Sequence, residues 1–221
     1  MNDLEKNNLI DIYRRNILVF QMLYEFNYLP GGYIHPSRRS EFFHPVMSDE
    51  IWQNQRLWPR LSDAITKKLN IENDIYFAFP DQSWAFCLLS NEKIHRIASY
   101  IGAIVVGSRI RSSLARDEVL GWKERLGSDV YEFVMNQARL IKDYSFKSEF
   151  KEFRNIEALG YSVLLSCVND LPDAVKKRLQ LKFHAGAEFS DFDKKTSLDI
   201  LHSVMLILER EWYLLFDPKK N

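Results

Sequence analysis

Residues 94–110 carry the pattern that most constrains this fold, because large apolar and small side chains share one helical face there. The apolar residues recur at three- and four-residue intervals, the spacing of a buried helix face: Ile94, Ile97, Ala98, Ile101, Ile104, Val105 and Ile110. Ala98 and Gly102 lie one turn apart, and so do Ser99 and Ala103. We therefore expect a helix that begins after Ser90 and that another helix approaches closely.

Two more helices are expected directly after this one. The first runs from Asp117 to Leu126, Gly127 ends it in a left-handed conformation, and Ser128 begins the next. The buried stripe of that next helix is formed by Val130, Phe133, Val134, Ala138 and Ile141. Residues 88–141 therefore resemble a helical scaffold more than an active site.

The N-terminal helix, expected over residues 3–27, has two neighbouring apolar stripes. One consists of Leu9, Ile12, Asn16, Val19, Leu23 and Phe26, and the other of Ile10, Tyr13, Ile17, Phe20 and Tyr24. A helix with so wide an apolar surface is expected to be buried from two sides.

The remaining segments complete a mainly α fold. Further helices are expected over residues 48–57, 60–70, 155–167, 172–179 and 194–216, while residues 74–79 could be extended but cannot form a sheet alone. We predict a single compact multi-helix domain over residues 1–221, with irregular loops and at most a minor extended segment. Its parts are an N-terminal helix (1–27), a loop-rich part (28–83), a central helical core (84–183) and a C-terminal helix (194–216).

Composition restricts the class of protein. The 30 basic and 30 acidic side chains cancel, which argues against binding nucleic acid through bulk charge. Cys87 and Cys167 lie in apolar surroundings far apart in the sequence, as buried thiols of a reducing compartment do. The N-terminus does not resemble a signal peptide, and no apolar run is long enough for membrane insertion. We expect a cytoplasmic protein.

Candidate chemistry is sparse. The five histidines are scattered without metal-ligand spacing, so no metal, cofactor or catalytic residue is assigned. An enzyme using Cys87, with His95 eight residues later, or using His35 stays an alternative hypothesis. Another alternative is a DNA-binding regulator in which the helix–Gly127–Ser128–helix corner forms a helix-turn-helix, although Asp129 and Glu132 would oppose the phosphates.

The segment after the N-terminal helix is the richest cluster of aromatic, His, Pro and Arg residues. It contains Tyr33, His35, Pro36 and Arg38, and Pro36 keeps the residue before it out of the helical conformation. Two interpretations are open: a fixed loop whose Tyr and His satisfy backbone groups, or a surface patch that binds a partner.

An ordered set of motifs resembles the SctK family of type III secretion proteins, also called YscK, MxiK or OrgA. The resemblance includes Phe26-Asn27-x-x-Pro30-x-x-Tyr33-Ile34-His35-Pro36-Ser37-Arg38, then Leu88-Leu89, Ile94-x-x-Ile97-Ala98, Ile101-Gly102-Ala103, Ile110-Arg111, Glu118-Val119, Leu126-Gly127 and Leu179-x-Leu181-Lys182-Phe183. It extends over roughly residues 20–183.

The resemblance implies a function that the composition does not show. Proteins of this family are cytoplasmic, non-enzymatic accessory parts of the injectisome, in the sorting platform beneath the inner-membrane ring. They are thought to bridge the cytoplasmic domain of the ring protein SctD and the pod protein SctQ, which connects to SctL and the ATPase SctN. The implied function is that of an adaptor, with Tyr33, His35, Pro36 and Arg38 as candidate partner-binding residues.

Overall fold

The chain divides into two compact units. A computed structural model describes residues 10–44, 47, 49–78, 80–137, 155–187 and 191–217. Unit 1 consists of Met1–Asn91 and Asp170–Gly186, and unit 2 of Glu92–Asn169 and Ala187–Asn221, so each unit is built from two separate stretches of chain. The single domain expected over residues 1–221 stays a prediction.

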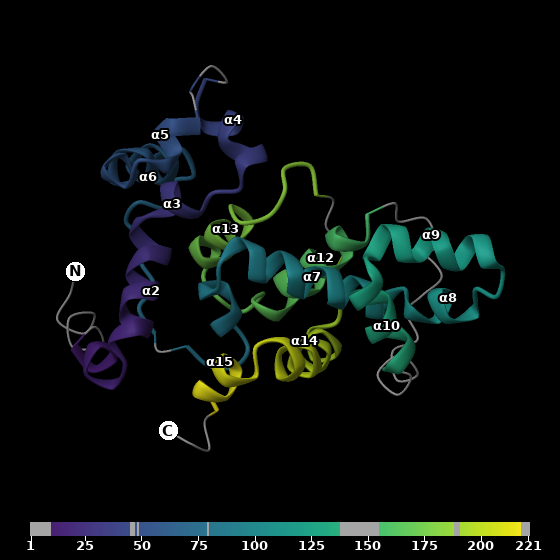
Figure 1. Cartoon of the computed structure of the whole chain (residues 1–221). Helices are drawn as coiled ribbons and strands as arrows, with labels where there is room; N and C mark the ends of the chain where they lie inside the picture. The colour runs from purple at the N-terminus through teal and green to yellow at the C-terminus, as the bar shows by residue number, and fades with distance from the viewer. Residues whose placement is uncertain are drawn as a thin grey trace. The chain divides into compact units, whose positions relative to one another are not determined.

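The predicted mainly α fold is confirmed. Helices account for the regular structure, and the described residues contain no β-strand (Figure 1). In the same residues, no helix combines the length and the apolar character needed to cross a bilayer.

Unit 1 contains many short helices, including several within the part that was expected to be loop-rich. In chain order they are α2 (Ile17–Tyr28), α3 (Pro30–Tyr33), η1 (Pro36–Arg38), α4 (Arg39–Phe42), α5 (Asp49–Gln53), η2 (Gln55–Leu57), α6 (Trp58–Lys68), η3 (Ala85–Leu88) and α13 (Asp173–Gln180). One small core of this unit consists of Ile34, Trp52, Leu61, Ile65 and Leu181. Gly31 lets α3 pack closely on α6, because a Cβ on this glycine would lie 2.8 Å from the Leu61 Cβ.

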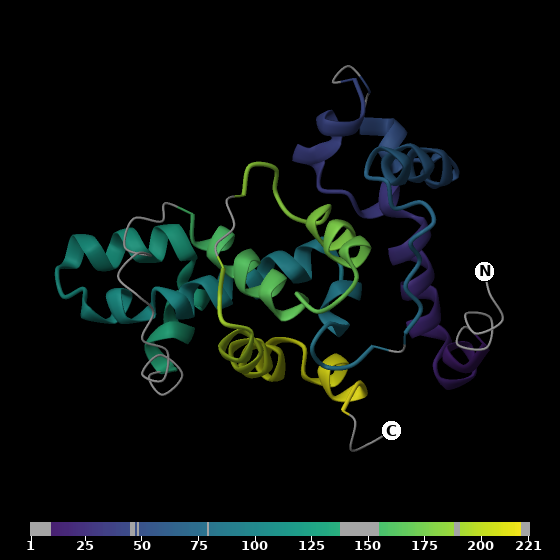
Figure 2. The same cartoon turned by 180° about the vertical axis from the view of Figure 1, so that it is seen from behind.

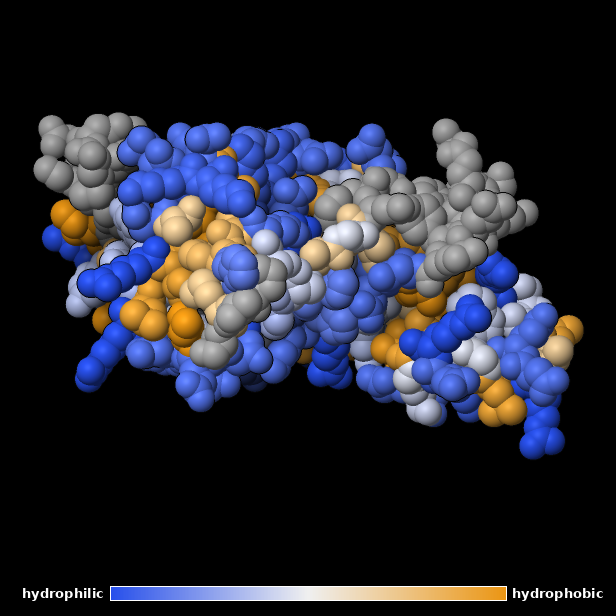
Figure 3. Space-filling view, turned by 90° about the horizontal axis from the view of Figure 1, so that it is seen from above, coloured by the Kyte–Doolittle hydropathy of each residue, from blue (hydrophilic) through white to orange (hydrophobic). Residues whose placement is uncertain are grey.

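Hydrophobic side chains surround this small core. Those that are partly buried against it include Phe42, Phe43, Met47 and Ile51. Figure 3 looks down on the α4–α5 side of unit 1 and shows hydrophobic surface gathered at the left.

The prediction of a single N-terminal helix is wrong, because the helix is interrupted at Asn16. Residues 10–15 are helical, and α2 starts anew at Ile17. Asn16 has an extended conformation, and its side-chain oxygen accepts from the N–H groups of Leu18 and Val19 at 3.0 and 3.2 Å. It is an N-cap rather than a member of an apolar stripe.

The prediction that this region is buried from two sides is also wrong for the described residues. The stripe that includes Val19, Leu23 and Phe26 is buried, whereas Ile17 and Tyr24 of the second stripe are exposed. Only one of the two apolar faces therefore contributes to the core of unit 1.

Unit 2 holds the central and C-terminal helices. They are α7 (Asn91–Val105), α8 (Gly107–Ser112), α9 (Arg116–Leu126), α10 (Ser128–Asn136), α12 (Ile156–Cys167), α14 (Lys194–Leu208) and α15 (Arg210–Leu215). The corner between α9 and α10 lies where it was predicted, and Gly127 has a φ of 80°, which favours glycine. Ala138 and Ile141, predicted for the α10 stripe, lie outside the described residues.

Two of the predicted long helices are interrupted. The helix after Ser90 breaks at Val106, so that Ile110 lies on α8 rather than on α7. The C-terminal helix breaks at Glu209, whose φ and ψ of −137° and 45° are not helical. The Glu209 carboxylate accepts from the Lys93 ammonium of α7 at 2.7 Å. A continuous helix would give Glu209 a different backbone conformation and would change the position of this carboxylate.

Another helix, α12, packs closely against the small residues of α7, as predicted. A Cβ on Gly160 of α12 would lie 1.9 Å from the Ala98 carbonyl oxygen, and a Cβ on Gly102 would lie 1.9 Å from the Ile156 carbonyl oxygen. Because the contacts pair 98 with 160 and 102 with 156, the two helices run antiparallel (Figure 1 and Figure 2). Unit 2 thus contains a close backbone-to-backbone crossing of α7 and α12.

Candidate functional site

Two segments far apart in sequence are joined in unit 1. The His35 N–H donates to the Leu181 carbonyl at 2.8 Å, and the Arg38 Nε–H donates to the Phe183 carbonyl at 2.8 Å. The Ala185 N–H donates to the Ser37 hydroxyl oxygen at 2.8 Å. We call residues 33–38 and 181–185 together the motif cluster, because two of the motifs quoted above meet in it.

Tyr33 anchors the motif cluster to α2. Its hydroxyl donates to the Phe26 carbonyl at 2.7 Å, and the two rings are stacked with centroids 6.0 Å apart. Burial raises the pKa of the Tyr33 phenol well above its ordinary value, so the group is a neutral donor. The backbone carbonyl of Tyr33 accepts from the Asn91 side chain.

His35 and Pro36 shape the turn that follows. The Nδ1 atom of His35 accepts from the Ser37 N–H at 3.2 Å and lies 2.7 Å from the Ser37 hydroxyl oxygen. The ring centroid of His35 lies 5.2 Å from that of His184. Pro36 and His184 are exposed, so this part of the motif cluster is accessible from solvent.

Arg38 fastens the end of the turn. Besides its bond to Phe183, its guanidinium lies 3.1 Å from each carboxylate oxygen of Glu41. The structure therefore brings the four predicted site residues together. The contacts described for Tyr33, His35 and Arg38 hold the loop, and Pro36 presents its surface to solvent.

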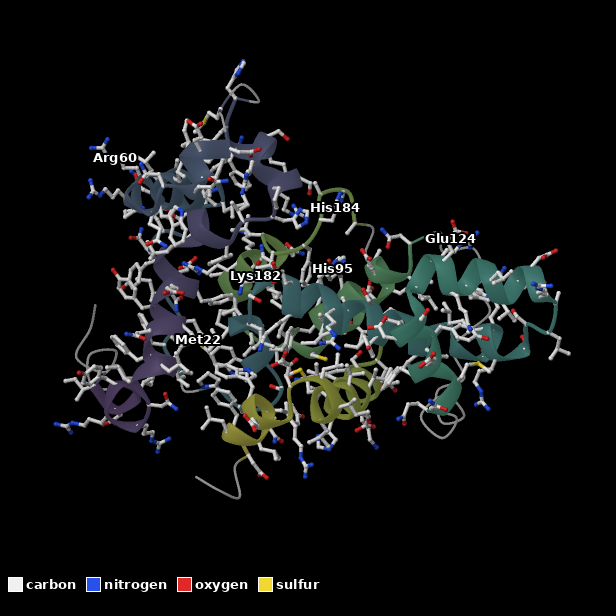
Figure 4. The ribbon with its side chains drawn as sticks, in the orientation of Figure 1. Met22, Arg60, His95, Glu124, Lys182 and His184 are labelled. Carbon is white, nitrogen blue, oxygen red and sulfur yellow. The ribbon has the colours of Figure 1, made fainter. Side chains whose placement is uncertain are left out.

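Lys182 is the charged centre of the motif cluster, although sequence reasoning gave it no role. Its ammonium donates to the carbonyls of Cys87 at 2.8 Å and Leu89 at 2.7 Å. It also lies 4.8 Å from the ring centroid of Tyr33 and 5.6 Å from that of Phe26, which are cation–π distances. Burial lowers the pKa of Lys182 to about 8. Figure 4 labels Lys182 and His184, which follow α13 in this cluster.

Arg178 acts in a similar way one turn earlier. Its side chain is 1% exposed and donates to the carbonyls of Asn27, Ile71 and Asp74 at 3.2, 3.1 and 2.7 Å. The sequence contained a signal for this burial, because Arg178 shares a helical face with Ala174 and Val175. The hydrogen-bond acceptors described for both buried cations are backbone carbonyls rather than carboxylates.

Cys87, the candidate nucleophile of the enzyme alternative, lacks the environment of an activated thiol. Cys87 is fully buried, and burial raises the pKa of its thiol well above the ordinary value, so the thiolate is disfavoured. In unit 2, His95 Nδ1 lies 2.9 Å from the Tyr161 hydroxyl, and Nε2 lies 3.3 Å from a Glu157 oxygen. The described residues contain no group of three His, Cys, Asp or Glu placed to hold a metal ion.

The α9–α10 corner was the basis of the DNA-binding alternative. Asp129 and Glu132 are exposed on α10, and the Asp129 carboxylate accepts from the Tyr100 hydroxyl at 3.0 Å. These carboxylates would repel a phosphate backbone that approached this helix.

Comparison with known proteins identifies the family. The family described as "YOP proteins translocation protein K (YscK)" matches residues 21–200, which include both segments of the motif cluster. The comparison gives no support to a DNA-binding function. Neither the curated proteins nor the solved structures provided a match. With most of its length matched, the chain belongs to the YscK family and is a protein of the type III secretion machinery.

Proposed function

We propose that this protein is a non-catalytic adaptor of the type III secretion sorting platform. In this function it bridges the cytoplasmic domain of the ring protein SctD and the pod protein SctQ, and through SctQ it connects to SctL and the ATPase SctN. Such an adaptor lies in the cytoplasm, peripheral to the inner membrane. Family membership supports the assignment to the machinery, and the motif resemblance supports the bridging role.

One observation carries the proposal: a rigid, solvent-accessible turn is built at the point where two family motifs meet. Residues 35–38 are held by the backbone N–H of His35, which donates to the Leu181 carbonyl, and by the side chains of Arg38 and Ser37, which bond to the backbone of Phe183 and Ala185. A turn fixed in this way loses little conformational entropy on binding, which favours recognition by a protein partner. In the proposed interface Pro36 and His184 touch the partner, while Tyr33, His35 and Arg38 keep the turn in shape.

The division into two units supports a bridge between two partners. Each unit contains its own buried helices, so each can present a binding surface of its own. The motif cluster supplies one surface, on unit 1, and the second partner then binds elsewhere.

The test is co-purification of the tagged protein with SctQ and with the cytoplasmic domain of SctD. Pro36→Glu and His184→Glu place a charge on the exposed part of the motif cluster without removing the Tyr33 or Arg38 bonds. We expect each to weaken capture of one partner at least tenfold and to leave the other unchanged. Arg60→Glu, on the exposed surface of α6 in the same unit, is the matched control.

The outcomes separate the parts of the proposal. Normal capture of both partners by Pro36→Glu and His184→Glu means that the motif cluster is structural. Capture of neither partner by the folded wild-type protein contradicts the bridging function itself.

A further inference from the structure

Residues 74–78 lie beside α2 as an extended segment. They are neither helical nor in a turn, and Figure 2 shows the stretch between α6 and η3 passing along α2. Asn27 of α2 holds this segment, because its side-chain amide donates to the Tyr76 carbonyl and accepts from the Tyr76 N–H, both at 3.0 Å. These two groups of Tyr76 therefore point to the same side, as they do when a residue pairs with a neighbouring strand.

The opposite edge of the segment is open. In an extended chain the N–H and C=O groups of successive residues alternate between two edges, so those of Ile75 and Phe77 face away from Asn27. Among the described residues these groups have no hydrogen-bond partner. Backbone groups without a partner in the fold need water or another chain. Ile75 and Phe77 are two residues apart, which is the spacing at which an antiparallel strand exchanges pairs of hydrogen bonds.

Aromatic rings line both faces of the segment. Successive side chains of an extended chain point to opposite faces. The centroid of the Phe77 ring lies 6.0 Å from that of Tyr28, and the centroid of the Tyr76 ring lies 5.4 Å from that of Trp84. A strand added at the open edge would place its own side chains beside these rings, where apolar and β-branched side chains pack well.

The ends of the segment are acidic. Glu72 and Asp74 lie at its start and Asp81 follows its end, all three are exposed, and residues 71–83 contain no Lys or Arg. Arg178 bonds to the Asp74 carbonyl, but its side chain is 1% exposed, so its charge is directed inward. A strand that pairs at the open edge is therefore favoured when it carries Lys or Arg near its ends.

A second copy of this chain does not suit this edge. If two copies paired antiparallel through Ile75 and Phe77, the acidic residues at the start of one segment would lie near Asp81 of the other. If they paired in parallel, each acidic residue would lie beside its own counterpart. Like charges on paired strands are destabilising. The occupant with matching chemistry is a basic strand of a different protein.

We propose that residues 74–78 are a docking edge, at which an extended segment of another protein pairs as an added β-strand. That segment is basic near its ends and apolar or β-branched between them. Asn27 pairs with the inner edge as a neighbouring strand would, and the outer edge is left for the partner. The docking edge shares no residue with the motif cluster, and the proposal does not rest on the adaptor function.

Titration of the full chain, labelled with nitrogen-15, with a synthetic peptide tests the proposal by NMR. The probe is acetyl-Lys-Lys-Val-Thr-Val-Thr-Val-Lys-Lys-amide, in which lysines flank alternating valine and threonine. We expect the amide signals of Ile75 and Phe77 to shift saturably and their hydrogens to exchange more slowly with water. The same peptide with methyl groups on its five central backbone nitrogens cannot donate these hydrogen bonds and should not bind.

Substitutions at the docking edge separate the backbone and charge contributions. Ile75→Pro removes one N–H donor and should weaken binding at least tenfold, whereas Ile75→Val keeps the donor and should bind as the wild type does. Glu72→Lys combined with Asp74→Lys changes exposed side chains only, so the fold should persist. This pair should also weaken binding at least tenfold, and Glu124→Lys, at an exposed position of α9, is the matched control.

Three results would overturn the proposal. The first is no change at Ile75 and Phe77 with millimolar peptide, and the second is an equal change with the methylated peptide. The third is equal binding of a peptide whose lysines are replaced by glutamates, since the acidic ends would then select nothing. Because the test uses neither SctQ nor SctD, its failure is distinguishable from a failure of the adaptor function.

Discussion

Gly160 and Ala98 lie so close that the α carbon of one faces the carbonyl oxygen of the other with no room for a side chain between them. A Cβ at position 160 would lie 1.9 Å from that oxygen, and the nearest atoms are backbone, which cannot rotate away. Gly102 and Ile156 repeat the arrangement one turn along α7 and α12. The packing of unit 2 therefore depends on two glycines.

Gly160→Ala should accordingly separate α7 from α12. We expect a loss of about 3 kcal/mol or more in the free energy of unfolding, measured by urea denaturation, because overpacked backbone has no easy relaxation. Gly121→Ala is the matched control, since a Cβ there meets nothing within 4 Å. That control should stabilise α9 by about 0.5–1 kcal/mol, and equal effects of the two variants would contradict the close crossing.

Arg178→Leu should destabilise unit 1 strongly. It removes the donors for the carbonyls of Asn27, Ile71 and Asp74, and buried acceptors without a donor are unfavourable. We expect a loss of more than about 3 kcal/mol in thermal or urea unfolding. Arg60→Leu, at an exposed position of α6, should stay within about 0.5 kcal/mol of the wild type, and a similar result for Arg178→Leu would refute the role assigned to it.

The lowered pKa of the buried Lys182 predicts a specific dependence of stability on pH. Its pKa is about 8 in the folded protein and 10.5 ordinarily, so between these values the unfolded chain binds more protons at this site. The contribution of Lys182 to the free energy of unfolding should therefore rise with pH from about 8 to 10.5, by as much as about 3 kcal/mol. Below pH 8 both states hold the proton, and this lysine contributes no slope.

Urea unfolding at several pH values, compared between the wild type and Lys182→Met, measures this effect. The difference in the free energy of unfolding between the wild type and Lys182→Met should change over this pH range, whereas the difference between the wild type and Lys195→Met, at an exposed position of α14, should stay constant. Parallel curves for the wild type and Lys182→Met would show that Lys182 titrates normally.

Asn27 should contribute strongly to stability, because its side-chain amide satisfies both backbone groups of Tyr76, as the backbone of a paired strand would. Its amide group donates to the Tyr76 carbonyl and accepts from the Tyr76 N–H, both at 3.0 Å. Asn27→Leu removes both bonds at a side chain that is 2% exposed, and we expect it to lower stability by roughly 2–4 kcal/mol. Asn54→Leu, at an exposed N-cap, should lower it by only about 1 kcal/mol, and the reverse order would refute this account.

The helices and their packing were largely predictable from local sequence. The apolar periodicity predicts α7, and the small residues Ala98 and Gly102 predict that another helix packs closely against it. Gly127 marked the corner after α9, because few other residues adopt its conformation. These features depend on neighbours in sequence, which a single chain displays directly.

The breaks and the buried cations were not predictable in this way. The spacing of Asn16 fits an apolar stripe, although Asn is also a preferred helix cap, and only the backbone conformation decides between the two. Lys182 and Arg178 are ordinarily surface residues, and their burial depends on carbonyls that come from distant segments. The motif cluster likewise required residues 33–38 and 181–185 to meet, which spacing along the chain does not reveal.

The two-stretch construction of unit 1 has a consequence for synthesis. The carbonyls of Asn27, Ile71 and Cys87 leave the ribosome long before Arg178 and Lys182, which donate to them. Unit 1 therefore cannot complete its core until translation has passed residue 186 and that segment has emerged. Until then the first 91 residues are a nascent chain with exposed apolar side chains, open to chaperones and to aggregation. Unit 2 waits longer still, because its second stretch, Ala187–Asn221, is the last part of the chain to be made.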